Sequence, residues 1–190
     1  MSLLTLQMPA LPNPVKVVLQ PATTALLVFD MIDRICQSQP NCTGVMVPAL
    51  AALLARARKA GVFVLYSTRE PESSKWVPDV APAPGDPVVK STGQDRFYNT
   101  DLDSTLKAKG IKTVILTGWK VSGSVVYTSV GATLRGYTVV VPTDASLAAT
   151  DYEVAIVQFQ ILNQNSANAI NEPLKANAST LSRADMIVFQ

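Results

Sequence analysis

Hydrophobic residues along the chain gather in short runs that alternate with amphipathic stretches. Four runs have the apolar profile of strands buried on both faces, as in a parallel sheet. They are Ala25–Phe29, Val62–Tyr66, Thr113–Thr117 and Tyr137–Val141. Val15–Leu19 and Val88–Lys90 are shorter strand candidates, and a last strand or short helix is expected within residues 178–188.

Segments with helical periodicity separate these runs. A helix is predicted from about Val45 to Ala60, because its apolar residues share one face and Gly61 follows as a C-cap. Three more helices begin at residues that can cap them, namely Thr100, Ser122 and Thr150. The predicted helices span residues 45–60, 100–109, 122–135 and 150–161.

Strands that alternate with helices of this length form βαβ units. The pattern therefore predicts an α/β fold, a three-layer α/β/α doubly wound arrangement with a mostly parallel sheet. We expect a single domain over residues 1–190, with residues 1–22 as a proline-rich N-terminal extension. Residues 31–44, 67–87 and 163–176 are predicted loops.

In such sheets, ligands bind beyond the carboxyl ends of the strands. This rule selects the residues that follow each predicted strand as candidates for a site. They are Asp30, Ser67 to Arg69, Lys90, Gly118 to Ser124, and Thr143 to Ser146.

Composition narrows the chemistry of that site. The 190 residues include no histidine, so Ser-His-Asp and Cys-His catalysis and histidine metal sites are excluded. The formal net charge is only +2 and there is no basic run, which argues against nucleic acid or an anionic membrane as partner. A small-molecule ligand fits better.

Asp30 and Lys90 form the first candidate pair. Burial at the end of an apolar strand favours the neutral form of Asp30 unless a cation sits beside it, and Lys90 is the candidate cation. A buried Asp–Lys pair can carry out general acid–base catalysis. The alternative is a capping carboxylate and an exposed lysine.

The segment from Gly118 to Val125 is a predicted strand-to-helix turn whose amides can bind an anion or oxyanion. Ser124 would lie in the first helical turn, either as a nucleophile or as a polar residue of the turn. Neighbouring residues are candidates for substrate binding, namely Trp119, Lys120, Gly123 and Tyr127. Glycine-rich nucleotide-binding patterns are absent, so no cofactor is expected.

Four further side chains are weaker candidates. Arg69 and Arg96 can pair with a substrate carboxylate, although surface arginines are the commoner outcome. Cys36 and Cys42 are expected as small, semi-buried thiols. A disulfide between them is not expected in a reducing cytosol. The N-terminus lacks the charged start of a signal peptide and no apolar run is long enough for a membrane helix, so a cytoplasmic protein is expected.

Taken in order, these segments resemble the isochorismatase-like hydrolases, also called the cysteine hydrolase superfamily, over about residues 24–182. The matching pieces are TALLVFDM with Asp30, VVK with Lys90, FYNTDLD, VILTGWKVSGSVVYTSVGATLRGY, and YTVVVPTDAS with Asp144. The resemblance implies the same α/β/α fold, a small-molecule substrate, and a homodimer or homotetramer. Asp30 and Lys90 stand where the family has its acid and its lysine, although the stretch after Lys90 is about one residue longer than usual.

The chain departs from the family at the nucleophile. Amidase members have cysteine where this sequence has Ser124, and Val121 also differs from their pattern. A serine cannot form a thiolate. The nicotinamidase members' metal site, which uses histidine, has no histidine here, so no metal is expected. An engineered replacement of the nucleophilic cysteine by serine would be a single change at position 124. It would not explain why Val121 also departs from the family pattern, so Val121 argues against it.

These departures favour acid catalysis of the vinyl-ether type found in another branch of the family. In this hypothesis Asp30 protonates the substrate, Lys90 holds a substrate carboxylate or developing charge, and Ser124 positions substrate or water. Two alternatives remain: a serine-nucleophile amidase or esterase, and a non-catalytic relative that binds a small molecule or a partner.

Overall fold

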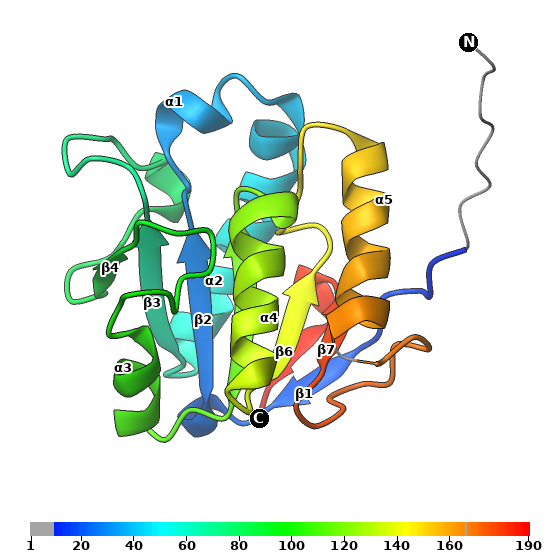
Figure 1. Cartoon of the computed structure of the whole chain (residues 1–190). Helices are drawn as coiled ribbons and strands as arrows, with labels where there is room; N and C mark the ends of the chain where they lie inside the picture. Colours follow the sequence, from blue (N-terminus) through cyan, green and yellow to red (C-terminus); the bar gives the residue numbers. More distant parts are fainter. Residues whose placement is uncertain (1–9, 166) are drawn as a thin grey trace, which may run out of the picture.

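A computed structural model describes residues 10–165 and 167–190, so residues 1–9 of the expected N-terminal extension lie outside it. Its centre is a six-stranded sheet in the order β4-β3-β2-β5-β6-β7, with every pair parallel (Figure 1). The strands are β2 (Thr24–Phe29), β3 (Phe63–Thr68), β4 (Val88–Lys90), β5 (Thr113–Gly118), β6 (Thr138–Pro142) and β7 (Ser179–Ser182). The predicted parallel α/β architecture is confirmed.

Helices cover both faces of this sheet and make three layers. Helix α2 (Val47–Lys59) packs on one face, and α3 (Leu102–Ala108), α4 (Val126–Leu134) and α5 (Asp151–Gln160) lie on the other (Figure 1). Alternate residues of β2 enter opposite cores: Leu26 and Val28 face α2, whereas Leu27 faces the other three helices. This double burial explains why β2 is apolar throughout.

The strand order sets the position of the site. From β2 the chain moves outward to β3 and β4, then returns to place β5 on the other side of β2. The point where the strand order reverses therefore lies between β2 and β5. A parallel sheet opens a crevice at the carboxyl ends of two such strands, and ligands bind there. Asp30 follows β2 and the Gly118–Ser124 turn follows β5, so both reach this crevice.

Several local elements differ from the sequence prediction. Segment 15–19 contributes β1 (Val17–Leu19), which pairs with β8 (Ile187–Phe189) in a separate two-stranded parallel sheet. Ser122 does not cap α4, because a kinked turn over Val121–Val125 delays the start of that helix to Val126. The cap predicted at Thr150 is present, since its hydroxyl accepts a hydrogen bond from the Glu153 amide.

The segment expected as a loop over residues 31–44 is largely helical. It contains α1 (Asp33–Cys36) and a wide helical turn over Cys42–Met46 that leads into α2. These turns bring the Cα atoms of Cys36 and Cys42 to 5.2 Å, and the two cysteines form a disulfide. The expectation of two separate thiols is therefore wrong, because it assumed an open loop between them.

Candidate active site

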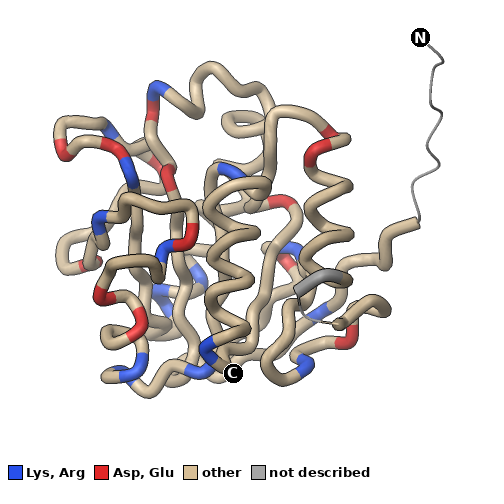
Figure 2. The backbone as a smooth tube through the Cα atoms, in the orientation of Figure 1, with Lys and Arg blue, Asp and Glu red and all other residues tan. Residues whose placement is uncertain are grey.

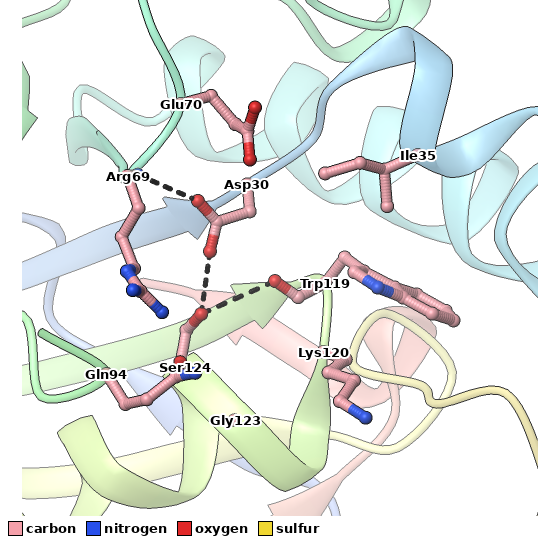
Figure 3. A pocket seen from close by; sticks show the side chains of 9 residues that line it. All are labelled: Asp30, Ile35, Arg69, Glu70, Gln94, Trp119, Lys120, Gly123 and Ser124. Atoms are coloured by element: carbon pink, nitrogen blue, oxygen red, sulfur yellow. Dashed lines mark hydrogen bonds between the residues drawn. The ribbon is translucent and has the colours of Figure 1, made fainter.

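Asp30 is held at the end of β2 by its backbone. Its φ is 48°, in the left-handed region that aspartate tolerates better than most residues. Its amide donates to the Ser67 carbonyl of β3 at 3.1 Å. The carboxylate therefore leaves the strand at a fixed angle and points across the crevice toward the turn after β5 (Figure 3).

Gly118 lets that turn pass close to β2. Its φ is 104°, and a Cβ atom at this position would lie 2.1 Å from the carbonyl oxygen of Phe29. The Trp119 amide then donates to the same carbonyl at 2.9 Å. Only glycine permits this approach, and the approach brings Ser124 beside Asp30.

Ser124 and Asp30 are in direct contact. The Ser124 hydroxyl donates to Asp30 Oδ2 at 2.7 Å and accepts from Arg96 Nη2 at 2.6 Å. Arg96 Nη2 also forms an ion pair with Asp30 Oδ2. The amide of Arg69 donates to the other carboxylate oxygen at 3.1 Å. The side chains of Asp30, Ser124 and Arg96 thus form a closed triangle of hydrogen bonds.

Arg96 is the buried cation of this triangle. Its side chain is 0% exposed, its guanidinium lies 5.6 Å from the centre of the Phe29 ring, and its amide donates to Thr128 Oγ1 on α4. Burial lowers the pKa of Arg96, and the charge of Asp30 opposes that shift. Nε and Nη1 are buried without a hydrogen-bond partner among the described residues. The contact with Asp30 is therefore the main compensation for burying this charge.

Lys90 is not part of the triangle. It is exposed at the end of the edge strand β4, where its Nζ donates to the backbone carbonyl of Glu70. There it lines a neighbouring pocket of about 290 Å³ together with Trp76. Within the described residues, the structure brings no atom of Lys90 into a hydrogen bond or ion pair with Asp30.

From the sequence, Arg96 is expected only as a partner for a substrate carboxylate. The sequence carries one signal for the different role of Arg96: the stretch that follows Lys90 is about one residue longer than usual in the family. A longer connection can change which residue faces the crevice, and here the loop between β4 and α3 carries Arg96 back over Phe29.

Above the triangle lies an open pocket of about 380 Å³. Its lining residues are Asp30, Ile35, Arg69, Glu70, Gln94, Trp119, Lys120, Gly123 and Ser124 (Figure 3). The pocket thus brings together most of the predicted site residues. Lys90 and Tyr127 are the exceptions: Lys90 lines the neighbouring pocket, and Tyr127 lies on α4 with 55% of its surface exposed and lines neither.

Charges around the pocket are mixed. Acidic and basic residues are interspersed in the loops beside β3 and β4 (Figure 2). At the rim, Lys120 Nζ lies 2.6 Å from Glu153 Oε1 on α5. The hydrogen bonds that Lys120 and Ser122 donate to Glu153 lower the pKa of that carboxyl group. The pocket is therefore suited to a polar ligand.

Comparison with known proteins identifies the family of the chain. The model of the Isochorismatase domain matches residues 24–170. The chain belongs to the isochorismatase family. Among curated proteins, it is 30% identical over 160 residues to the ureidoacrylate amidohydrolase RutB of Methylobacterium radiotolerans, an alignment that covers 58% of this chain and 61% of that relative. The chain thus spans about three fifths of the length of this relative.

Solved structures of other proteins share the fold of this chain. N-carbamoylsarcosine amidase from Thermoplasma acidophilum has a TM-score of 0.70 at 23% identity, covering 86% of this chain and 97% of that one. A cysteine hydrolase from Pseudomonas syringae pv. phaseolicola has a TM-score of 0.72 at 20% identity, covering 95% of each chain. The isochorismatase-like α/β fold of the chain is established by this agreement.

The described residues hold neither a metal-binding cluster nor a membrane-spanning helix. In residues 10–165 and 167–190, no three or more aspartate, glutamate or cysteine side chains come together as a metal site requires. Among the same residues, no helix combines the length and the apolar character needed to cross a membrane.

Proposed function

We propose that the protein hydrolyses a small molecule that carries an amide, ureido or ester carbonyl, with Ser124 as nucleophile and Asp30 as general base. The observation that carries this proposal is the 2.7 Å hydrogen bond from the Ser124 hydroxyl to Asp30 at the floor of the pocket. A nucleophile within hydrogen-bond reach of its base is the arrangement that hydroxyl-based covalent catalysis needs.

In the first step, Ser124 Oγ attacks the substrate carbonyl and its proton moves to Asp30 Oδ2. Asp30 then passes that proton to the leaving group, and an acyl-enzyme remains on Ser124. In the second step, water attacks the acyl group, Asp30 accepts its proton, and the proton returns to Ser124 as the acid product leaves. A guanidinium stays protonated in proteins, so Arg96 orients Ser124 and Asp30 without exchanging a proton.

Acid catalysis by Asp30 fits the contacts less well. Asp30 oxygens accept from the Arg69 amide, from Arg96 and from Ser124. An ionised carboxylate accepts all three hydrogen bonds, whereas a protonated acid would lose one of them. The names of the relatives also favour a carbonyl substrate, because ureidoacrylate amidohydrolase and N-carbamoylsarcosine amidase are both named for C–N bond hydrolysis.

The test is a hydrolysis screen with amides, ureido acids, carbamoyl compounds, simple esters and isochorismate. We expect turnover of at least one carbonyl compound and a drop of roughly a thousandfold or more in kcat/KM for Ser124→Ala and Asp30→Asn. Ser104→Ala, an exposed serine on α3, is the matched control and should keep wild-type activity.

Mass spectrometry separates the mechanisms. Rapid quenching of the active enzyme should show an acyl adduct on the peptide that contains Ser124. Pyruvate release from isochorismate that survives Ser124→Ala but not Asp30→Asn would instead establish acid catalysis. A blank screen with tight ligand binding would point to the non-catalytic alternative.

A further inference from the structure

In the pocket that contains Ser124, Arg69 is the one lining cation whose side chain has no carboxylate partner among the described residues. The other charges are paired: Asp30 with Arg96, Glu70 with Arg34, and Lys120 with Glu153. Arg69 uses only its backbone amide, which donates to Asp30 Oδ1. Its guanidinium is exposed to the pocket and points toward the same space as the Ser124 hydroxyl (Figure 3).

We propose that Arg69 binds the carboxylate of the substrate, so that the site acts on small carboxylic acids whose hydrolysable carbonyl lies a short distance from the acid group. This inference rests on the proposed function, since it names the substrate class of the same pocket. A guanidinium offers two parallel N–H donors that match the two oxygens of a carboxylate. The pocket of about 380 Å³ limits the ligand to a small molecule.

The charge balance at the floor of the site supports this assignment. Arg69 acts electrostatically on Arg96 and contributes to lowering the pKa of that buried guanidinium. The carboxylates nearby already have cationic partners, since Asp30 pairs with Arg96, Asp95 with Arg135 and Glu70 with Arg34, so the positive charge of Arg69 is left over. A bound anion would balance it. A neutral ligand would leave Arg69 without an ionic partner.

The experiment compares a matched pair of probes, N-carbamoylglycine and N-carbamoylglycinamide, which differ only in a carboxylate replaced by a carboxamide. Binding is measured by calorimetry on Ser124→Ala, so that neither probe is consumed. We expect the acid to bind roughly ten- to a hundredfold more tightly than the amide, as a charge-assisted bidentate contact would give.

Variants of Arg69 then assign the preference to one side chain. When Arg69→Gln is combined with Ser124→Ala, the two probes should bind with equal affinity. Arg69→Lys in the same background should keep part of the difference in affinity, because lysine retains the positive charge but not the two parallel N–H donors of the guanidinium. Arg183→Gln is the control, since Arg183 follows the edge strand β7, pairs with Asp144 and does not line the Ser124 pocket. Equal binding of both probes, no binding of either at millimolar concentration, or a preference that survives Arg69→Gln would overturn the inference.

Turnover by the wild-type enzyme separates this inference from the proposed function. Acid-selective binding through Arg69 without turnover of any carbonyl compound would remove the proposed function and keep the ligand class. Turnover with the same kcat/KM for acid and amide substrates would keep the function and remove the role of Arg69.

Discussion

Two cations close to the same edge of the sheet have opposite environments. Arg96 is fully buried and contacts both Asp30 and Ser124, whereas Lys90 is exposed and contacts a backbone carbonyl. They are six residues apart in the sequence. Lys90 ends a three-residue edge strand whose exposed and buried positions alternate, so its side chain faces outward. Arg96 lies on a loop that α4 holds in place.

The difference shows that the loop, rather than the strand, supplies the charge for the site. Two contacts fix the backbone of Arg96: its amide donates to Thr128, and its carbonyl accepts from Thr100 at 2.6 Å. From this fixed backbone, the guanidinium extends over Phe29 to Asp30. Lys90, at the end of a strand, has no such anchor, and its flexible stem leaves the ammonium group at the exposed surface.

The strongest test of this comparison is truncation of each cation. Arg96→Ala should lower the free energy of unfolding by about 3 kcal/mol, because it leaves Asp30 without its ionic partner and opens a void. Lys90→Ala should change it by less than about 0.5 kcal/mol. Urea denaturation measures both. Equal losses for the two variants would contradict the assignment of Arg96 as the structural partner of Asp30.

A second test concerns the close approach that delivers Ser124. Gly118→Ala should cost at least about 2 kcal/mol, because its Cβ would collide with the backbone of Phe29 at a positive φ. Gly85→Ala is the matched control: it has a similar φ of 94° but open space around the added atom, so about 1 kcal/mol is expected. Thermal denaturation of the two variants gives the comparison. Similar losses of stability in the two variants would mean that backbone strain alone, without the collision with Phe29, sets the cost of an added Cβ atom at Gly118.

Much of this site could be predicted from the sequence because it depends on the sheet. Apolar runs identify β2 and β5 as buried strands, and the carboxyl ends of parallel strands lie along one edge of a sheet, so Asp30 and Ser124 are both expected at that edge. That the two strands are neighbours and the two side chains in contact comes from the structure. Arg96 could not be placed in this way. Its direction depends on anchors in Thr100 and on α4, and no local pattern reports such tertiary contacts.

The same reasoning explains the other differences. The start of α4 is delayed because Gly123 has non-helical backbone angles, and the turn instead sends Ser122 to Glu153 on another helix. The pairing of Cys36 with Cys42 required knowing that the segment between them coils. In each case a contact between separate elements overrides the local signal.

A third test addresses Tyr66, which packs against Trp76 beside the pocket that Lys90 lines. Tyr66 is buried there, edge-on to Trp76 at 5.4 Å between ring centres, and its hydroxyl donates to the Val80 carbonyl at 3.0 Å. Tyr66→Phe should cost about 1 kcal/mol at pH 8 through the lost hydrogen bond. Urea denaturation gives this value, and a loss near zero would mean that the hydroxyl contributes no net stability.

The pH dependence of that loss has a definite sign. Burial raises the pKa of Tyr66 to about 12, from an ordinary value of 10.0. Its contribution to stability is therefore complete below about pH 10 and is lost as the pH rises toward 12, since the unfolded chain ionises first. The advantage of the wild type over Tyr66→Phe should shrink over this range. An advantage that stays constant from pH 8 to 12 would contradict a buried phenol.

The smallest effect is expected at the rim of the first pocket, where Glu153 is partly exposed. Hydrogen bonds from Lys120 and Ser122 lower its pKa below the ordinary value of 4.5, so the carboxylate stabilises the fold above that pH. This contribution disappears as the pH falls through the lowered value. Glu153→Gln should cost less than about 1 kcal/mol at pH 7, because solvent screens the pair.

The difference between the wild type and Glu153→Gln should shrink as the pH falls below 4.5, as unfolding curves at several pH values will show. Glu72→Gln, an exposed glutamate near the second pocket, is the control and should leave those curves unchanged. A difference that grows on acidification would mean that Glu153 is held in its protonated form, which would reverse the charge assigned to this rim. Lys120 would then be a second cation without a carboxylate partner in this pocket, and a substrate carboxylate could bind Lys120 instead of Arg69.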